Sequence, residues 1–393
     1  MFLTREEERA LGGELGPAVA LAMRILVKLG DLYGADRLVP IESAHVSGIS
    51  YKTGGDAALE FLRELHQMGA RVAVPSTTNP CGFDERILPL LDLPEEVVGK
   101  QRELLDLYGR LGIARTLTCT PYYLRRPRPG AHLAWAESSA VVYANSVAGA
   151  CTNREGAPSA LAAAIAGRTP DHGLHRPENR QPGMAFEVLF RPADEVELWA
   201  VGFLVGQVAR EAVPLISGLK GLSDWELKGL GAAMASGGMT AMFLLAEEGG
   251  RGASGGLEKV QVGREEVRDV IDGLSSADEP ELVFVGCPHC SREELRLIAG
   301  LLRGRRVRED RQLWICTSRH LKDACPSLVK AIEASGALVL ADMCVVVSWV
   351  ERLGVRTVAT NSPKAAYYLP SLSGVEVRLA SLRECVELAC SRG

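Results

Sequence analysis

The last third of this 393-residue sequence alternates short apolar runs with amphipathic segments, and few architectures accommodate that alternation. The apolar runs have the length and β-branched composition of buried strands, and the segments between them have helical spacing. Buried strands that alternate with helices predict a parallel sheet covered by helices on both faces. The five expected strands are Glu281–Gly286, Gln312–Ser318, Ala337–Cys344, Val355–Ser362 and Val375–Ser381.

Polar and sulfur-bearing side chains stand where each of these expected strands ends. In open parallel sheets, ligands bind beyond the carboxyl ends of the strands, so these side chains are candidates for one common site. An alternative for the Ser, Thr and Asn positions is that they cap the helices that follow. The residues are Cys287, His289, Cys290, Thr317, Ser318, Arg319, Asp342, Cys344, Asn361, Ser362, Lys364 and Ser381.

The first two-thirds of the chain also predict a mixed α/β fold. Three stretches each predict a strand that is followed by a polar loop. These stretches contain His45, Cys81 and Cys119, respectively. The chain is longer than the size at which a single hydrophobic core stops growing, so two or three domains are expected. A glycine-rich stretch marks a linker. We therefore expect an N-terminal region at 1–250, a linker at 251–276 and a C-terminal domain at 277–393.

Composition excludes several classes of function. The net charge is −5, and no stripe of Lys and Arg is interleaved with aromatic residues, which argues against nucleic-acid binding. The longest apolar runs are too short to span a membrane. The N-terminus is acidic and lacks the apolar segment of a signal peptide. A cytoplasmic enzyme is the expectation.

The sequence holds ten cysteines, which in a reducing compartment do not predict a disulfide framework. Three lie in helical patterns and are expected to pack as small apolar side chains: Cys325, Cys385 and Cys390. Four others each end an apolar run and begin a loop: Cys81, Cys119, Cys287 and Cys344.

Three kinds of chemistry remain open for these thiols. A structural zinc site normally uses two short-spaced pairs, and only one such pair exists, Cys287 with Cys290. The same pair could exchange electrons as a dithiol, because a strand-to-helix junction lowers a thiolate pKa. An iron–sulfur cluster on three thiolates, with one iron left open, suits cysteines that are widely spaced on different strand ends.

Several motifs together resemble aconitase X, a divergent branch of the aconitase superfamily. They are "TLTCTPY", "ESSAVVYANSVAGACTNREGAPSALAAAIAGRTP", "GLHRPENR", "GCPHCS", "ADMC" and "TNSPKAAYYLP". The resemblance covers almost the whole chain. Within the family, the chain looks like the large subunit of the archaeal two-subunit type. The resemblance implies an aconitase-like multi-domain α/β architecture with parallel sheets flanked by helices. Cluster and substrate are then expected at the strand C-terminal ends between domains.

The resemblance also implies a cofactor and a reaction. Its motifs place the ligands of a [4Fe–4S] cluster at Cys119, Cys287 and Cys344, with Cys290 and Cys81 as the competing thiols. The implied reaction is dehydration of (R)-5-phosphomevalonate to trans-anhydromevalonate 5-phosphate in an archaeal mevalonate pathway. Hydroxyproline dehydration, known from other members of the family, is the alternative within it. A thiol–disulfide redox protein is the alternative outside it.

A small swivelling subunit is implied as partner, and by resemblance to aconitases it supplies a serine base. On this chain, Glu137 and Ser138 are expected near the cluster, where they orient substrate or exchange protons; an alternative is that they cap a helix. Arg154 and Arg319 are further anion candidates. His45 is a candidate proton shuttle, with a hydrogen-bonded structural histidine as the alternative. For Lys364 the alternative is a solvated lysine without a substrate role. The expected substrate-binding residues are Gly48, Ile49, Ser50, Asn79, Pro80, Glu137, Ser138 and Lys364.

Overall fold

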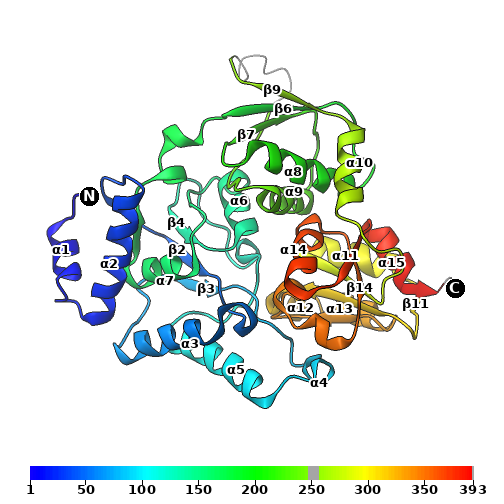
Figure 1. Cartoon of the computed structure of the whole chain (residues 1–393), viewed down its shortest axis with the longest axis horizontal. Coiled ribbons are helices and arrows are strands. Elements are labelled where there is room, and N and C mark those ends of the chain that lie inside the picture. The colour runs from blue at the N-terminus through cyan, green and yellow to red at the C-terminus, as the bar shows by residue number, and fades with distance from the viewer. Residues whose placement is uncertain (247–255, 392–393) are drawn as a thin grey trace. The chain divides into compact units, whose positions relative to one another are not determined.

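The computed structural model describes residues 1–246 and 256–391 and divides into two compact units (Figure 1). The first unit comprises Met1–Gly82 and Leu93–Gln181. The second comprises Phe83–Asp92 and Pro182–Gly393. Each unit has its own sheets and its own buried core, and we describe each separately.

The first unit contains a three-stranded parallel sheet in the order β3-β2-β4 and an antiparallel pair, β1-β5. Its strands are β1 Leu38–Pro40, β2 Ser43–Val46, β3 Ser76–Thr78, β4 Leu133–Trp135 and β5 Arg168–Pro170. Its α-helices are α1 Arg5–Leu11, α2 Pro17–Leu32, α3 Tyr51–Gln67, α5 Glu95–Arg110, α6 Ser138–Ser146 and α7 Ala157–Ala166. Helices α2 and α7 pack against each other, and α3 packs against α5.

The alanine-rich sequence of α7 explains its central place in this unit. Residues Ser159–Ile165 are all buried, so small side chains allow α2 and the strand β2 to approach the α7 backbone closely. Helix α5 instead has one apolar face, on which Leu104, Leu107 and Tyr108 are buried. Both helices lie in the region for which the sequence predicts a mixed α/β fold.

The second unit contains two parallel sheets. The first has the order β8-β7-β6-β9, with strands β6 Met184–Val188, β7 Pro214–Ser217, β8 Leu244–Leu245 and β9 Lys259–Val262. Its helices are α8 Glu195–Ala209, α9 Asp224–Gly237 and α10 Arg264–Gly273. A Cβ atom at Gly206 of α8 would lie 2.2 Å from the carbonyl oxygen of Met234 on α9, so these two helices pack backbone against backbone.

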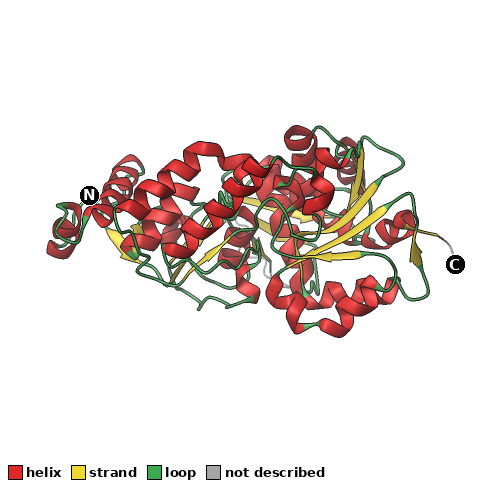
Figure 2. Ribbon diagram, turned by 90° about the horizontal axis from the view of Figure 1, so that it is seen from below, coloured by secondary structure: helices red, strands yellow, loops and turns green. Residues whose placement is uncertain are grey.

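The second sheet is the five-stranded parallel sheet that the sequence predicts, in the order β13-β12-β10-β14-β15. The strands are β10 Leu282–Cys290, β12 Gln312–Thr317, β13 Leu338–Leu340, β14 Thr357–Thr360 and β15 Glu376–Leu379. Helices lie on both sides of these strands (Figure 2). They are α11 Arg292–Leu301, α12 Arg319–Ala324, α13 Pro326–Glu333, α14 Pro363–Ser373 and α15 Leu382–Ala389. Helix α14 also packs against α8 and α9.

The short elements complete the fold. They are α4 Leu88–Leu91, the antiparallel pair β11 Arg306–Val307 and β16 Cys390–Ser391, and the 3-10 turns η1 Pro121–Tyr123, η2 Gly173–His175, η3 Pro177–Arg180, η4 Val345–Val347 and η5 Val350–Leu353. None of the described helices is long and apolar enough to cross a bilayer.

The structure differs from the sequence-based expectation in two places. The segment 251–276, expected to be a linker, includes β9, which pairs with β6, and the helix α10; residues 251–255 lie outside the described residues. The division between compact units falls at Gln181 and Pro182 instead. A third strand ending at Cys119 is also absent, because Leu117 has a left-handed φ of 45° that interrupts extended pairing.

Candidate active site

In the first unit, the loop Gly48–Ser50 is held by a buried glutamine that sequence reasoning missed. The amide of Gln101, on α5, donates to the Ile49 carbonyl oxygen over 2.8 Å and accepts from the Tyr51 N–H over 2.9 Å. Gln101 and Ser50 are both almost completely buried. Gly48 has a φ of 77°, which favours glycine. The loop backbone is therefore fixed from beneath.

The second polar loop of this unit connects to the start of α6. The Asn79 side-chain amide donates to the Glu137 carboxylate over 2.7 Å, and Glu137 also accepts from the Ser139 hydroxyl over 3.0 Å. Glu137 is the N-cap of α6 and is 9% exposed, so the capping role considered from the sequence is present. Ser138, the first residue of α6, is half-buried.

His45 lies beneath the same network. Its Nδ1 is 2.8 Å from the Thr77 hydroxyl, and its Nε2 is 3.4 Å from Oδ1 of the Asn79 side chain. Because the Asn79 amide nitrogen faces Glu137, the Asn79 oxygen must accept, so His45 carries its proton on Nε2. Burial lowers the pKa of His45 to about 4, although the nearby Glu137 raises it. His45 is therefore neutral near pH 7.

Cys119 follows the strained turn at Leu117 and lies between two bonded threonines. The hydroxyls of Thr118 and Thr120 are 3.0 Å apart, and the Thr118 N–H donates to the carbonyl oxygen of Thr78 at the end of β3. Cys119 is 8% exposed. The loop that carries Cys119 is thus anchored to the carboxyl end of the first unit's parallel sheet.

In the second unit, Cys287 lies in an irregular part of β10. The register against β12 shifts between Val285 and Cys290, so the intervening residues form a bulge. Gly286 has a φ of 109°, and a Cβ atom there would lie 2.2 Å from the Cys316 carbonyl oxygen. The Cys287 side chain is half-buried.

Cys290 has a different environment from Cys287. It is completely buried in the apolar core of the five-stranded sheet, and this burial raises the pKa of its thiol well above the ordinary value. The same core contains Cys325, Cys385 and Cys390, as their helical patterns predicted. Cys81 is likewise buried in the core of the first unit. These environments favour Cys287 over Cys290 and Cys81 as a reactive or metal-binding thiol.

Cys344 begins a loop beyond β13, and the residue before it is hydrogen-bonded to the segment that carries Cys287. Asp342 has a left-handed φ of 65°, and Arg319 donates to its carboxylate over 3.1 Å. The ring of His289 lies 2.9 Å from the carbonyl oxygen of Met343. The Arg319 guanidinium is therefore paired with a carboxylate of this loop, and its expected role toward a substrate anion stays a prediction.

Lys364 occupies the first turn of α14, whose N-cap is Ser362. It is half-buried, as is Arg154 in the first unit. Pro80 is buried beside Asn79. Their expected substrate-binding role stays a prediction.

The thiols fit an iron–sulfur cluster by their chemistry and local backbone. Thiolates are the usual ligands of such clusters. Each of the three expected ligands follows a left-handed residue by one or two positions: Leu117 before Cys119, Gly286 before Cys287 and Asp342 before Cys344. At the two non-glycine positions, Leu117 and Asp342, this conformation is strained, and strained backbone gathers at functional sites. Over residues 1–246 and 256–391, no three His, Cys, Asp or Glu side chains converge as around a single metal ion.

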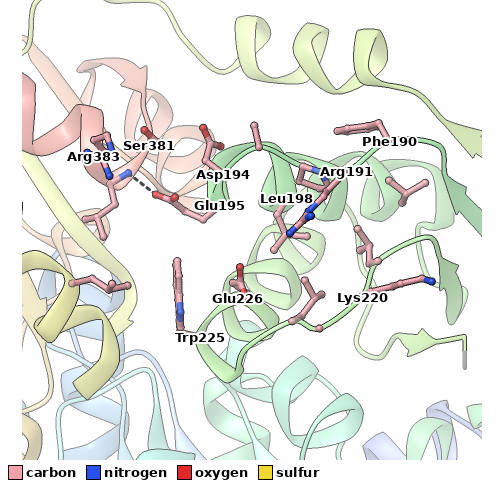
Figure 3. A pocket seen from close by; sticks show the side chains of 18 of the residues that line it. Phe190, Arg191, Asp194, Glu195, Leu198, Lys220, Trp225, Glu226, Ser381 and Arg383 are labelled. Carbon is pink, nitrogen blue, oxygen red and sulfur yellow. Dashed lines mark hydrogen bonds between the residues drawn. The ribbon is translucent and has the colours of Figure 1, made fainter. Parts of the chain in front are cut away.

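A large pocket in the second unit does not involve these residues. It has a volume of about 1330 Å³ and lies between the loops that follow β6 and β7 and the helices α11 and α15 (Figure 3). Glu195 lies at its edge and accepts a hydrogen bond from the Leu382 N–H, and burial raises the pKa of Glu195. Of the candidate residues named from the sequence, Ser381 lines this pocket, whereas the expected cluster ligands and substrate-binding residues do not.

Comparison with family models matches three consecutive segments of the chain. Residues 1–178 match the aconitase X first domain, 182–272 the second domain and 280–391 the third domain. The break between the first two matches agrees with the division between the compact units.

Curated relatives cover the chain almost completely. It is 42% identical to the phosphomevalonate dehydratase large subunit of Methanocaldococcus jannaschii, over 98% of this chain and 100% of that protein. It is 35% identical to the cis-3-hydroxy-L-proline dehydratase of Pseudomonas aeruginosa, over 98% of this chain but 69% of that protein. The crystal structure of Thermococcus kodakaraensis aconitase X in its holo-form matches with a TM-score of 0.91 and 41% identity, over 99% of this chain and 100% of that one.

Proposed function

Because the chain belongs to the aconitase X family, we propose that it is the large subunit of a phosphomevalonate dehydratase. This hydro-lyase removes water from (R)-5-phosphomevalonate to give trans-anhydromevalonate 5-phosphate, in a mevalonate pathway to isoprenoids. The observation that carries the proposal is the 42% identity to a large subunit of that name over its full length. We place the reaction in the cytoplasm.

The proposed cofactor is a [4Fe–4S] cluster held by Cys119, Cys287 and Cys344. When bound, the cluster supplies an iron Lewis acid for oxygen atoms of the substrate. The exposure of Cys287 and Cys344 and the left-handed turn before each ligand support this assignment. Cys290 is left out of the proposed ligand set because its thiol is completely buried in the apolar core of the five-stranded sheet.

Residues of the first unit orient the substrate. The loop Gly48–Ser50 has a backbone fixed by Gln101, and its N–H groups suit a carboxylate or phosphate oxygen. Asn79 and Glu137 hold each other in one geometry, so the Glu137 carboxylate is positioned to hold or move a proton beside Ser138. In the second unit, the proposed partner of an anionic group of the substrate is Lys364, at the start of α14.

The partner is a small subunit, because the relatives are named large subunits. We propose that this swivelling subunit supplies the serine base that takes the proton next to the substrate carboxylate.

Two other functions are less well supported. Hydroxyproline dehydration is favoured only by relatives of lower identity, at 35% and 32%. A thiol–disulfide role for Cys287 and Cys290 requires a reactive thiolate, which a lowered pKa favours. Burial instead raises the pKa of the Cys290 thiol.

Anaerobic co-expression with the small subunit tests the proposal. The purified complex should be brown, and its broad absorption should bleach in air. It should dehydrate phosphomevalonate and not hydroxyproline. Turnover of the amino acid alone would favour the alternative within the family, and colourless protein with two reversibly oxidised thiols would favour the redox function.

A further inference from the structure

A lysine buried in the second unit makes contacts that neither the fold nor the proposed reaction explains. Lys228, on α9, is 1% exposed. Its ammonium group donates to the Glu294 carboxylate over 2.5 Å and to the carbonyl oxygen of His289 over 2.9 Å, and it lies 3.5 Å from the Pro288 carbonyl oxygen. All three donors of the ammonium are thereby directed at the start of α11 and the residues after Cys287.

Glu294 is fixed independently of the lysine. It is 5% exposed and belongs to the capping box of α11, in which its carboxylate accepts from the Ser291 N–H over 2.7 Å. Burying an ion pair costs desolvation energy that its attraction often fails to recover, so an apolar pair would serve packing equally well. The charge is therefore explained better by the backbone carbonyls that it binds.

Those carbonyls belong to the bulged part of β10 that carries Cys287, called here the Cys287 loop. The same segment also contacts the loop of Cys344, the other expected ligand in this unit. The backbone of His289 is held by Lys228, whereas its ring lies 2.9 Å from the Met343 carbonyl oxygen. Met343 directly precedes Cys344. A continuous set of bonds therefore links α9, the Cys287 loop and the Cys344 loop.

We propose that Lys228, with Glu294 and His289, is a positioning residue that holds Cys287 and Cys344 in the geometry for cluster ligation. The proposal rests on the proposed function for the cluster itself. In this proposal Lys228 acts through the backbone carbonyls that it binds and is itself neither a ligand nor a substrate contact. The Lys228 ammonium takes the place of water at the Pro288 and His289 carbonyl oxygens, in the part of β10 where the bulge interrupts the pairing with β12. Lys228 thereby fixes the loop before the cluster binds.

The test uses the full-length chain in two states. In the apoprotein, alkylation of individual cysteines is followed by mass spectrometry, which reads loop order without any cluster. In the reconstituted holoenzyme, iron content and the rate of absorption loss in air are measured. Lys228→Met should raise Cys287 alkylation about 10-fold or more and speed cluster loss on the order of 10- to 100-fold. His289→Leu should act mainly on Cys344.

Two internal comparisons separate positioning from general destabilisation. Cys385, buried in α15, should be alkylated no faster in Lys228→Met than in the unmodified chain. The matched control is Arg311→Met. The Arg311 side chain is 8% exposed, pairs with Glu279 and donates to the Leu388 carbonyl oxygen over 2.7 Å, but Arg311 directly precedes β12. This variant should leave Cys287 at its original rate.

Equal acceleration at Cys287 and Cys385 would overturn the proposal, as would an unchanged Cys287 rate. If Lys228→Met does not accumulate as folded protein, Glu294→Gln provides the same comparison, because it keeps an acceptor for the Ser291 N–H. A chain that takes up no iron while Lys228→Met still exposes Cys287 would refute the cluster and support the fixed loop.

Discussion

The side-chain amide of Asn79 donates to the Glu137 carboxylate over 2.7 Å, which joins the loop after β3 to the first turn of α6. The two residues are far apart in sequence and meet because β3 and β4 flank β2 in one parallel sheet. Their carboxyl ends therefore lie at the same edge. This relationship fixes one carboxylate oxygen, and Ser139 binds the other.

Replacement of Glu137 by glutamine should reduce kcat on the order of 10²- to 10⁴-fold, because the variant keeps the shape but loses a proton-exchanging group. Anaerobic assay of the two-subunit complex measures this loss. Glu7→Gln is the control, since Glu7 is a buried carboxylate in α1 that pairs with Arg168. Equal activity of the two variants would remove Glu137 from the reaction.

Replacement of Gln101 by leucine should weaken substrate binding more than turnover. The change leaves the Tyr51 N–H and the Ile49 carbonyl without their buried partner, which costs about 1–3 kcal/mol per unsatisfied group. We expect KM to rise about 10-fold as the Gly48–Ser50 loop loosens, a change of about 1.4 kcal/mol. A lower kcat at constant KM would contradict a binding role for this loop.

Gly286→Ala and Gly300→Ala should have opposite effects on the free energy of unfolding. A Cβ at Gly286 would collide with the Cys316 carbonyl at a positive φ, which should destabilise the fold by about 1–3 kcal/mol. Gly300 lies in α11 with open space around it, so alanine should stabilise by about 0.5–1 kcal/mol. Urea denaturation of the apoprotein measures both. A neutral Gly286→Ala would show that β12 can shift.

The stability of the apoprotein should fall as pH decreases from 6.5 to 4, in part because of His45. Its folded pKa of about 4 lies below the unfolded value of 6.5, so the unfolded chain binds more protons within this window. The contribution is fully present above 6.5 and is lost toward 4, a difference of about 3 kcal/mol. His45→Gln should reduce that slope in denaturation curves. An unchanged slope would assign the pH dependence to other buried groups.

Cys287→Ser and Cys290→Ala should separate the two members of the Cys-x-x-Cys pair. The first should abolish most of the visible absorption of the reconstituted protein while leaving unfolding nearly unchanged, because Cys287 is half-buried. The second should retain the absorption and lose stability, since Cys290 fills the core. The reverse pattern would make Cys290 the ligand.

The C-terminal sheet was predictable because its strands are apolar throughout and its helices are amphipathic, so local patterns and tertiary burial agree. The strand expected before Cys119 was wrong because apolar composition does not reveal the left-handed turn at Leu117. The strand β9 and the helix α10 were hidden by the glycine-rich composition around them.

By itself, the sequence determined the alternation of strands and helices and the placement of cysteines at the ends of apolar runs, because both follow from local periodicity. It could not reveal the partners of Gln101 or Lys228, whose helical positions look like ordinary polar residues. Their roles depend on which backbone carbonyls lie opposite them, and only the packing of helices against distant loops decides that. Tertiary structure likewise gave Cys287 and Cys290 different environments, since the burial of each thiol is a property of its surroundings and not of the motif.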